Sequence, residues 1–79
     1  MDIEVSLFAG MGKYSPDGKE AKHFCLDVAA GTTVESVLKK LDIPESAPKI
    51  LIVNGMVTHS KAMLKQGDIL SIYPPVGGG

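Results

Sequence analysis

Residues 31–41 read Gly-Thr-Thr-Val-Glu-Ser-Val-Leu-Lys-Lys-Leu, the one segment of this chain whose apolar residues follow a helical period, and they decide the fold. The apolar stripe of this helix consists of Val34, Val37, Leu38 and Leu41. Thr32 is expected to cap the first turn, with Glu35 returning the bond in a capping box, and Pro44 ends the helix. One helix with one apolar stripe can cover only one face of a sheet.

The segments on both sides of the helix predict the strands of that sheet. These strands are expected at residues 2–7, 23–28, 50–53, 56–58 and 69–73. The first two show the alternation of a half-buried strand, and Asn54-Gly55 is a strong signal for a hairpin between the third and fourth. Residues 10–18 predict a mobile, turn-rich loop, and 60–66 predict a turn or a single helical turn.

The predicted order is therefore strand, strand, helix, strand, short strand, strand. The economical packing lays the helix across one face, with the first and last strands adjacent and parallel and the crossover right-handed. The expected fold class is α+β, a β-grasp or ubiquitin-like fold with a mixed sheet of about four to five strands. Residues 1–73 form this domain, and 74–79 are expected to be a flexible tail.

Length and composition restrict the possible functions. A chain of 79 residues with 44% hydrophobic residues is globular but supports one small core, since a domain of this size buries only about 60% of its unfolded surface. No apolar run approaches the roughly 18 residues of a membrane span. The acidic start, with Asp2 and Glu4, is unlike an export signal, so we expect a cytoplasmic protein with no membrane partner.

Charge and cysteine content exclude further classes. The net charge is −1, the positive residues are scattered lysines, and no clustered basic footprint for nucleic acid is present. Cys25 is the single cysteine, which excludes an internal disulfide, and with two histidines it cannot complete a structural zinc site without acidic ligands. We therefore expect no bound metal or other cofactor.

The last six residues, Pro-Pro-Val-Gly-Gly-Gly, form a narrow segment that is suited to insertion into the active site of another protein. The prolines at 74 and 75 stiffen the base, and glycines at 77–79 leave a tip narrow enough to enter a slot that excludes side chains. An extended segment of this length reaches roughly 20 Å. The reacting group would be the carboxylate of Gly79, which ATP can convert to an acyl-adenylate; a sulfur nucleophile then displaces AMP and leaves a thiocarboxylate.

Residues 67–79, Gly-Asp-Ile-Leu-Ser-Ile-Tyr-Pro-Pro-Val-Gly-Gly-Gly, closely resemble the C-terminus of the MoaD/ThiS sulfur carriers, especially MoaD-type small subunits of molybdopterin synthase. Asn54-Gly55 and the Phe-Ala-Gly of residues 8–10 are also similar to the family, so the resemblance spans nearly the whole chain. Gly-Asp, a strand, Pro-Pro-Val and a terminal Gly-Gly are specific in combination. A terminal Gly-Gly alone would be a weak signal.

The resemblance implies a carrier rather than an enzyme. Gly78 and Gly79 match the terminal diglycine, and an E1-like enzyme would use ATP to adenylate Gly79 before a sulfur donor, such as a cysteine desulfurase or rhodanese, supplies the sulfur. In the MoaD-like case, Gly77, Gly78 and Gly79 enter the large catalytic subunit of molybdopterin synthase, where sulfur passes to a pterin precursor in molybdenum or tungsten cofactor biosynthesis.

Three alternatives stay open at this point. The triple glycine also occurs in some ThiS-like carriers, which serve thiazole synthase in thiamine biosynthesis. The chain can also be a ubiquitin-like modifier that conjugates Gly79 to lysines, or a non-catalytic interaction module with an inert tail. Loading with sulfur in the presence of an adenylating enzyme would separate the carriers from the inert module.

The tail root is the expected docking region. Phe8, Ile69 and Tyr73 are expected on the sheet face opposite the helix, and with the root residues they form the partner-docking set Phe8, Ile69, Tyr73, Pro74, Pro75 and Val76. The alternative is that the loop from Gly10 covers this face. His23, Cys25 and Asp27 share a face but are too widely spaced for direct hydrogen bonds, so we interpret them as a solvated strand face. His59 is interpreted as a surface residue.

Overall fold

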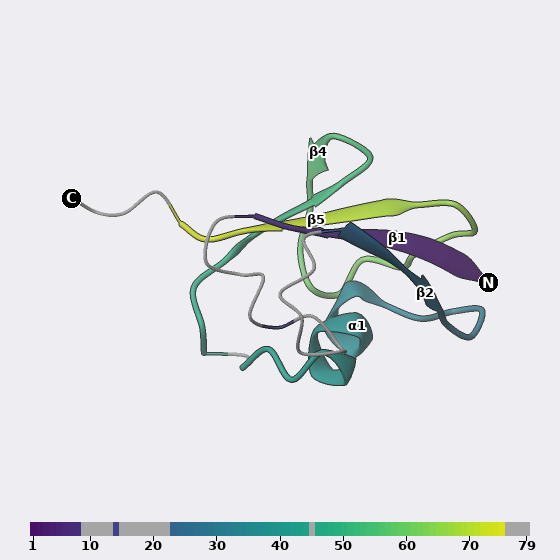
Figure 1. Ribbon diagram of the computed structural model, residues 1–79, viewed down its shortest axis with the longest axis horizontal. Helices are drawn as coiled ribbons and strands as arrows, with labels where there is room; N and C mark the ends of the chain where they lie inside the picture. The colour runs from purple at the N-terminus through teal and green to yellow at the C-terminus, as the bar shows by residue number, and fades with distance from the viewer. Residues whose placement is uncertain (9–13, 15–22, 45, 76–79) are drawn as a thin grey trace.

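The computed structural model describes residues 1–8, 14, 23–44 and 46–75. Its elements are β1 (Asp2–Leu7), β2 (His23–Asp27), α1 (Val34–Lys40), β3 (Ile50–Val53), β4 (Met56–Val57) and β5 (Ile69–Tyr73). Figure 1 shows α1 lying on one side of the sheet. The order of elements is the predicted one, and the β-grasp fold is confirmed.

The strands form one mixed sheet in the order β2-β1-β5-β3-β4. The first and last strands are parallel neighbours, with Val5 opposite Leu70 and Leu7 opposite Ile72, as predicted. All other neighbouring strands are antiparallel. The C-terminal strand therefore lies in the middle of the sheet, between β1 and β3 (Figure 1).

The core lies between α1 and the sheet face that it covers. Its most completely buried side chains are Ile3, Val5, Leu7, Val34, Val37, Leu70 and Ile72. The strand residues among them alternate with half-buried or exposed neighbours, so one face of β1 and β5 is buried and the other is open. Three of the four residues of the predicted helical stripe lie within α1, and Leu41 follows as its C-cap.

The helix begins one residue later than predicted, so the expected Thr32 cap is wrong. Thr33 is the N-cap and accepts a hydrogen bond from Ser36 N–H at 3.3 Å, whereas Thr32 Oγ1 donates to Ala29 O. Thr32 does not join the helix, because its carbonyl oxygen accepts a hydrogen bond from Leu64 N–H at 2.9 Å. Glu35 does not close a capping box; it forms an ion pair with Lys39 at 3.6 Å.

The hairpin between β3 and β4 turns at Asn54-Gly55, as predicted. Both residues have positive φ, 51° and 85°, which a two-residue turn of this type needs and which asparagine and glycine tolerate best. β4 is one residue shorter than expected, although Thr58 N–H still donates to Leu51 O.

Two smaller predictions concern the connections. Of the two alternatives predicted for residues 60–66, the structure has turns, at residues 60–61 and 66–67, and an isolated bridge joins Met63 to Thr33 between them. The loop predicted at 10–18 lies outside the described residues, except Tyr14, which is half-buried against the core. In the described part of the chain, no helix is long and apolar enough to cross a membrane.

Candidate functional site

The tail leaves the molecule from the centre of the sheet. β5 ends at Tyr73, and the β1–β5 pairing continues to that point, because Phe8 N–H donates to Ile72 O at 3.0 Å. Pro74 is half-buried and Pro75 is exposed. The predicted site residues Val76, Gly77, Gly78 and Gly79 lie outside the described residues, so their predicted role stays a prediction.

The root of the tail carries an aromatic pair. The rings of Phe8 and Tyr73 are stacked, with centroids 4.1 Å apart and planes 4° apart. Leu7 and Ile72 point into the core, so the next residue along each strand points to the open face opposite α1. The structure thus brings together two of the predicted docking residues, and Phe8 is 38% exposed.

Ile69 lies on the same open face but at the other end of β5. Ser71 stands between Ile69 and Tyr73 in the alternation, and Ile69 is paired with Glu4 rather than with Phe8. Ile69 is therefore about 13 Å from Tyr73 along the strand. It belongs to the predicted open face but not to the immediate tail root.

Three further apolar residues on this face were missed by sequence reasoning. Ile50 lies opposite Tyr73, Ile52 lies opposite Ser71, and Val57 lies opposite Ile52, so all share the open face. Val57 is 77% exposed. The open-face patch is defined as Phe8, Ile50, Ile52, Val57, Ile69 and Tyr73. Only the registers of β3 against β5 and of β4 against β3 identify the added residues, and a run such as Ile50–Val53 does not show which of its members face outward.

Ser6, His23 and Glu4 lie close together on the same face, in a group that resembles a catalytic triad in composition. Ser6 Oγ lies 2.9 Å from His23 Nδ1, and His23 Nε2 lies 3.7 Å from Glu4 Oε1. The His23 and Glu4 side chains are 58% and 42% exposed, so water competes for every contact. A nucleophile needs a shielded site with oxyanion donors, so we interpret this group as surface hydrogen bonding.

The other strand-face residues behave as expected. The described contacts of His23 go to β1 rather than to Cys25 or Asp27, the Cys25 thiol is exposed, and Asp27 Oδ1 lies 3.5 Å from the Met1 ammonium. His59 is exposed. Among the described residues, no group of three or more His, Cys, Asp or Glu side chains is placed to hold a metal ion.

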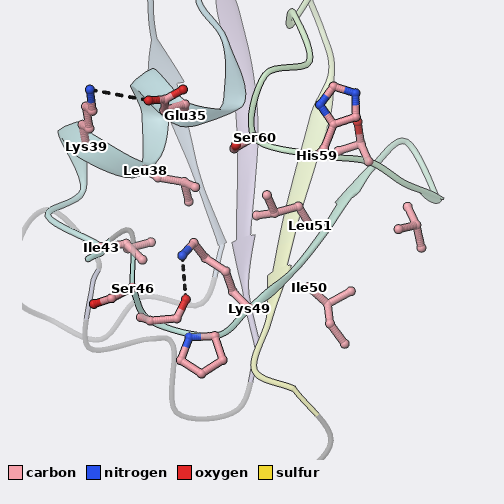
Figure 2. Close-up of a pocket in the computed structure, with 14 residues that line it drawn as sticks. Glu35, Leu38, Lys39, Ile43, Ser46, Lys49, Ile50, Leu51, His59 and Ser60 are labelled. Carbon is pink, nitrogen blue, oxygen red and sulfur yellow. Dashed lines mark hydrogen bonds and ion pairs between the residues drawn. The ribbon is translucent and has the colours of Figure 1, made fainter.

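A cavity of about 560 Å³ lies between α1 and β3 (Figure 2), and Ile50 and Val57 of the open-face patch also contribute to its lining. Its apolar lining includes Leu38, Ile43 and Leu51. The two lysines that line it already contact protein atoms: Lys39 pairs with Glu35, and Lys49 Nζ donates to Ala47 O at 2.6 Å. Both lysines of the lining are therefore already engaged by groups of the protein itself.

Comparisons with known proteins agree with this geometry. The family model of the ThiS family matches residues 19–79. No curated protein matches the chain in sequence.

Three solved structures show the same fold over nearly the whole chain. SAMP1 from Haloferax volcanii has a TM-score of 0.79 at 22% identity, covering 100% of both chains. A molybdopterin converting factor subunit 1, named as putative, from Pyrococcus furiosus has a TM-score of 0.76 at 19% identity, covering 96% of this chain and 99% of its own. A complex of subunits 1 and 2 of molybdopterin-converting factor from Helicobacter pylori gives 0.67 at 21% identity, with 100% of both chains covered.

The matched segment includes α1, β2 to β5 and the glycine tail, which is most of the molecule. The chain therefore belongs to the ThiS family of small ubiquitin-like sulfur carriers.

Proposed function

We propose that this protein is a sulfur carrier that is chemically modified at Gly79 and is not itself a catalyst. The observation that carries the proposal is the family match through residue 79, which includes the tail together with the strand that leads into it. The sulfur serves molybdopterin biosynthesis, with the chain acting as a MoaD-like small subunit. This assignment is supported by the fold it shares with the two molybdopterin-converting-factor structures.

The chemistry takes place on the tail carboxylate. An E1-like partner binds ATP, and the Gly79 carboxylate oxygen attacks the α-phosphate, which releases pyrophosphate and forms an acyl-adenylate. A persulfide sulfur then attacks the acyl carbon, AMP leaves, and reduction of the resulting acyl disulfide by a thiol yields the thiocarboxylate. The partner supplies Mg²⁺ and the electrostatic stabilisation, and this chain supplies the acyl group.

The domain positions the tail for these reactions. β5 is fixed on both sides by β1 and β3, so Tyr73 is a rigid base from which Pro74 and Pro75 project the following glycines. The stacked Phe8 and Tyr73 rings lie at that base, on the open-face patch. We assign this patch to partner docking, because exposed and half-buried apolar side chains beside a tail root are covered when a partner takes up the tail.

The partners follow from the same scheme. They are an E1-like adenylating enzyme, a sulfur donor such as a cysteine desulfurase or rhodanese, and the large catalytic subunit of molybdopterin synthase. The Helicobacter pylori structure is a complex of subunits 1 and 2 of such a factor, which supports a large-subunit partner for this chain. ATP belongs to the activating partner, and the carrier holds no cofactor of its own.

The decisive experiment is a loading reaction. The protein is incubated with its adenylating enzyme, ATP, Mg²⁺, a persulfide donor and a thiol reductant, and the intact mass is measured. The expected product is heavier by the exchange of one oxygen atom for one sulfur atom, located at Gly79 by fragmentation. An unchanged mass, under conditions that load an established carrier, would overturn the proposal.

A protein modifier is the second candidate, and the full-length likeness to SAMP1, a small archaeal modifier protein, favours it. The two functions share the adenylate and differ in the acceptor. Incubation of the adenylating mixture with cell extract, followed by tryptic digestion and mass spectrometry for lysines that carry the C-terminal peptide of residues 66–79, tests conjugation. The loaded protein given to molybdopterin synthase or to thiazole synthase distinguishes the pterin from the thiazole acceptor.

A further inference from the structure

β2 forms one edge of the sheet, and the direction of its backbone groups can be worked out residue by residue. Val28 N–H donates to Met1 O at 2.8 Å, and the Met1 ammonium donates back to Val28 O, so these two residues form a hydrogen-bonded pair. In an antiparallel ladder, hydrogen-bonded and non-hydrogen-bonded pairs alternate. In the observed register, the bonded pairs next in line are therefore Leu26 with Ile3 and Phe24 with Val5.

The remaining residues of β2 point their backbone groups away from β1. His23, Cys25 and Asp27 occupy the non-hydrogen-bonded positions, opposite Ser6, Glu4 and Asp2. Among the described residues, no backbone hydrogen bond reaches their N–H or C=O groups. β2 therefore presents a row of three N–H and three C=O groups at the outer edge of the sheet.

Within the described residues, this edge has no proline, lysine, bulge or shortened strand that would limit strand pairing. Natural sheets protect their edges with very short strands, prolines, lysines or bulges. The opposite edge, β4, is only two residues long, which limits pairing there. β2 is five residues long, contains neither lysine nor proline, and keeps an unbroken register against β1.

The sequence of β2 is complementary to itself in the antiparallel direction. It reads His-Phe-Cys-Leu-Asp, and a two-fold axis through Cys25 places His23 of one copy opposite Asp27 of the other. The same axis places Phe24 opposite Leu26, and both of these are only half-buried, whereas the β1 residues beside them, Ile3 and Val5, are 1% and 0% exposed. The imidazole of one copy therefore lies opposite the carboxylate of the other. Each half-buried apolar side chain of one copy likewise lies opposite an apolar side chain of the other.

We infer that β2 is a self-association edge, and that a second copy of this chain adds to it in antiparallel register centred on Cys25. All the outward N–H and C=O groups of the two strands are then paired, and two sheets become one. The axis is perpendicular to the sheet, so the two β5 strands point in opposite directions and both tail roots stay accessible. The dimer is thus compatible with a carrier function but does not depend on it.

Backbone pairing is tested with two substitutions at one position. Cys25→Pro removes an outward N–H while leaving the β1 ladder intact, since a proline with its nitrogen facing outward is tolerated on an edge strand. Cys25→Ala keeps that N–H and serves as the matched control. Sedimentation velocity over a wide concentration range should show wild type and Cys25→Ala moving towards twice the monomer mass, with Cys25→Pro staying monomeric.

Hydrogen exchange followed by NMR gives an independent readout on the wild-type protein. In dilute protein, the Cys25 amide should exchange much faster than those of Phe24 and Leu26, which are bonded to β1. It should become protected as the concentration rises. A wild type that stays monomeric at every concentration, with an unprotected Cys25 amide, would refute the inference.

The register of the proposed dimer is tested by changing the charges of the side chains that face each other across the two-fold axis. This test also applies if a thermal melt of dilute protein shows that Cys25→Pro is unfolded. His23→Asp places two carboxylates opposite each other at both ends of the paired strands and should weaken association at least tenfold. Adding Asp27→Lys restores an opposite-charge pair and should recover most of that loss. A double variant as weak as the single one would exclude this register.

Discussion

Asp68 is the one buried charged side chain among the described residues. Its Oδ1 accepts from Asn54 Nδ2 at 2.9 Å, and its Oδ2 accepts from Lys65 N–H at 2.8 Å. Asn54 Oδ1 in turn accepts from Ile69 N–H at 2.9 Å, so the β3–β4 turn is fastened to the start of β5. The Gly-Asp before the last strand, used above only as part of a family pattern, therefore has a structural role.

Replacing Asp68 with alanine should lower the free energy of unfolding by about 1–3 kcal/mol, because Asn54 Nδ2 and Lys65 N–H both lose their acceptor in a part-buried site. Urea unfolding measures the effect. Asp2→Ala is the matched control: Asp2 is exposed, and its change should stay within about 0.5 kcal/mol. Equal midpoints for the two variants would mean that the Asp68 contacts contribute nothing.

Asp68 also shows which kind of contact could not be predicted from the sequence. Its position before a strand can be read from the chain, but its partner Asn54 is fourteen positions away and is brought close only by the pairing of β3 with β5. The positive φ at Asn54 was predictable, since the turn requires it locally. Local geometry was thus readable, and contacts between distant segments were not.

At the scale of elements, the start of α1 gives the clearest test. Thr33→Ala should lower stability by about 0.5–2 kcal/mol, since Ser36 N–H loses the hydroxyl that caps it. Thr33→Ser keeps a hydroxyl and should stay close to wild type in thermal unfolding. If the alanine and serine variants have the same unfolding temperature, the hydroxyl at the N-cap does not contribute to stability.

The cap was misplaced for a reason that applies to elements in general. A capping-box pattern considers only the helix and the residue before it, whereas here the first-turn amides of Val34 and Glu35 donate to Ala62 O and Ser60 O. A distant segment thus supplies the acceptors and fixes where the helix begins. The first two strands were easier to predict, because the alternation within each of them reflects a single buried face.

The aromatic pair at the ends of β1 and β5 allows a separate prediction about docking. Phe8→Asp should reduce the rate of adenylation at limiting carrier concentration at least tenfold, because it places a charge in the open-face patch beside the tail root. Saturating carrier should recover most of the rate, since the reacting carboxylate is unchanged.

The matched control is Met63→Asp, an exposed apolar residue outside the open-face patch. It should load like wild type. If both variants lose the same activity, the effect comes from added negative charge in general and not from docking at Phe8.

For the whole molecule, the proposed division into a domain and a tail leads to a test that separates function from stability. Deleting Gly79 should abolish loading yet leave the unfolding temperature unchanged, because the core consists of residues between Ile3 and Ile72. Loading is followed by intact mass and stability by calorimetry. Loss of both together would show that the tail is part of the fold.

The parallel pairing of β1 with β5 has a mechanical consequence. The chain enters β1 at one end of this pair and leaves β5 at the other, so tension between the N-terminal end and the tail slides the two strands along each other. Bonds such as Glu4 N–H to Asp68 O and Phe8 N–H to Ile72 O are then loaded in shear together, rather than opened one after another. The domain should therefore resist a force that an enzyme applies through the glycine tail, because several hydrogen bonds must break at once before β5 separates from β1.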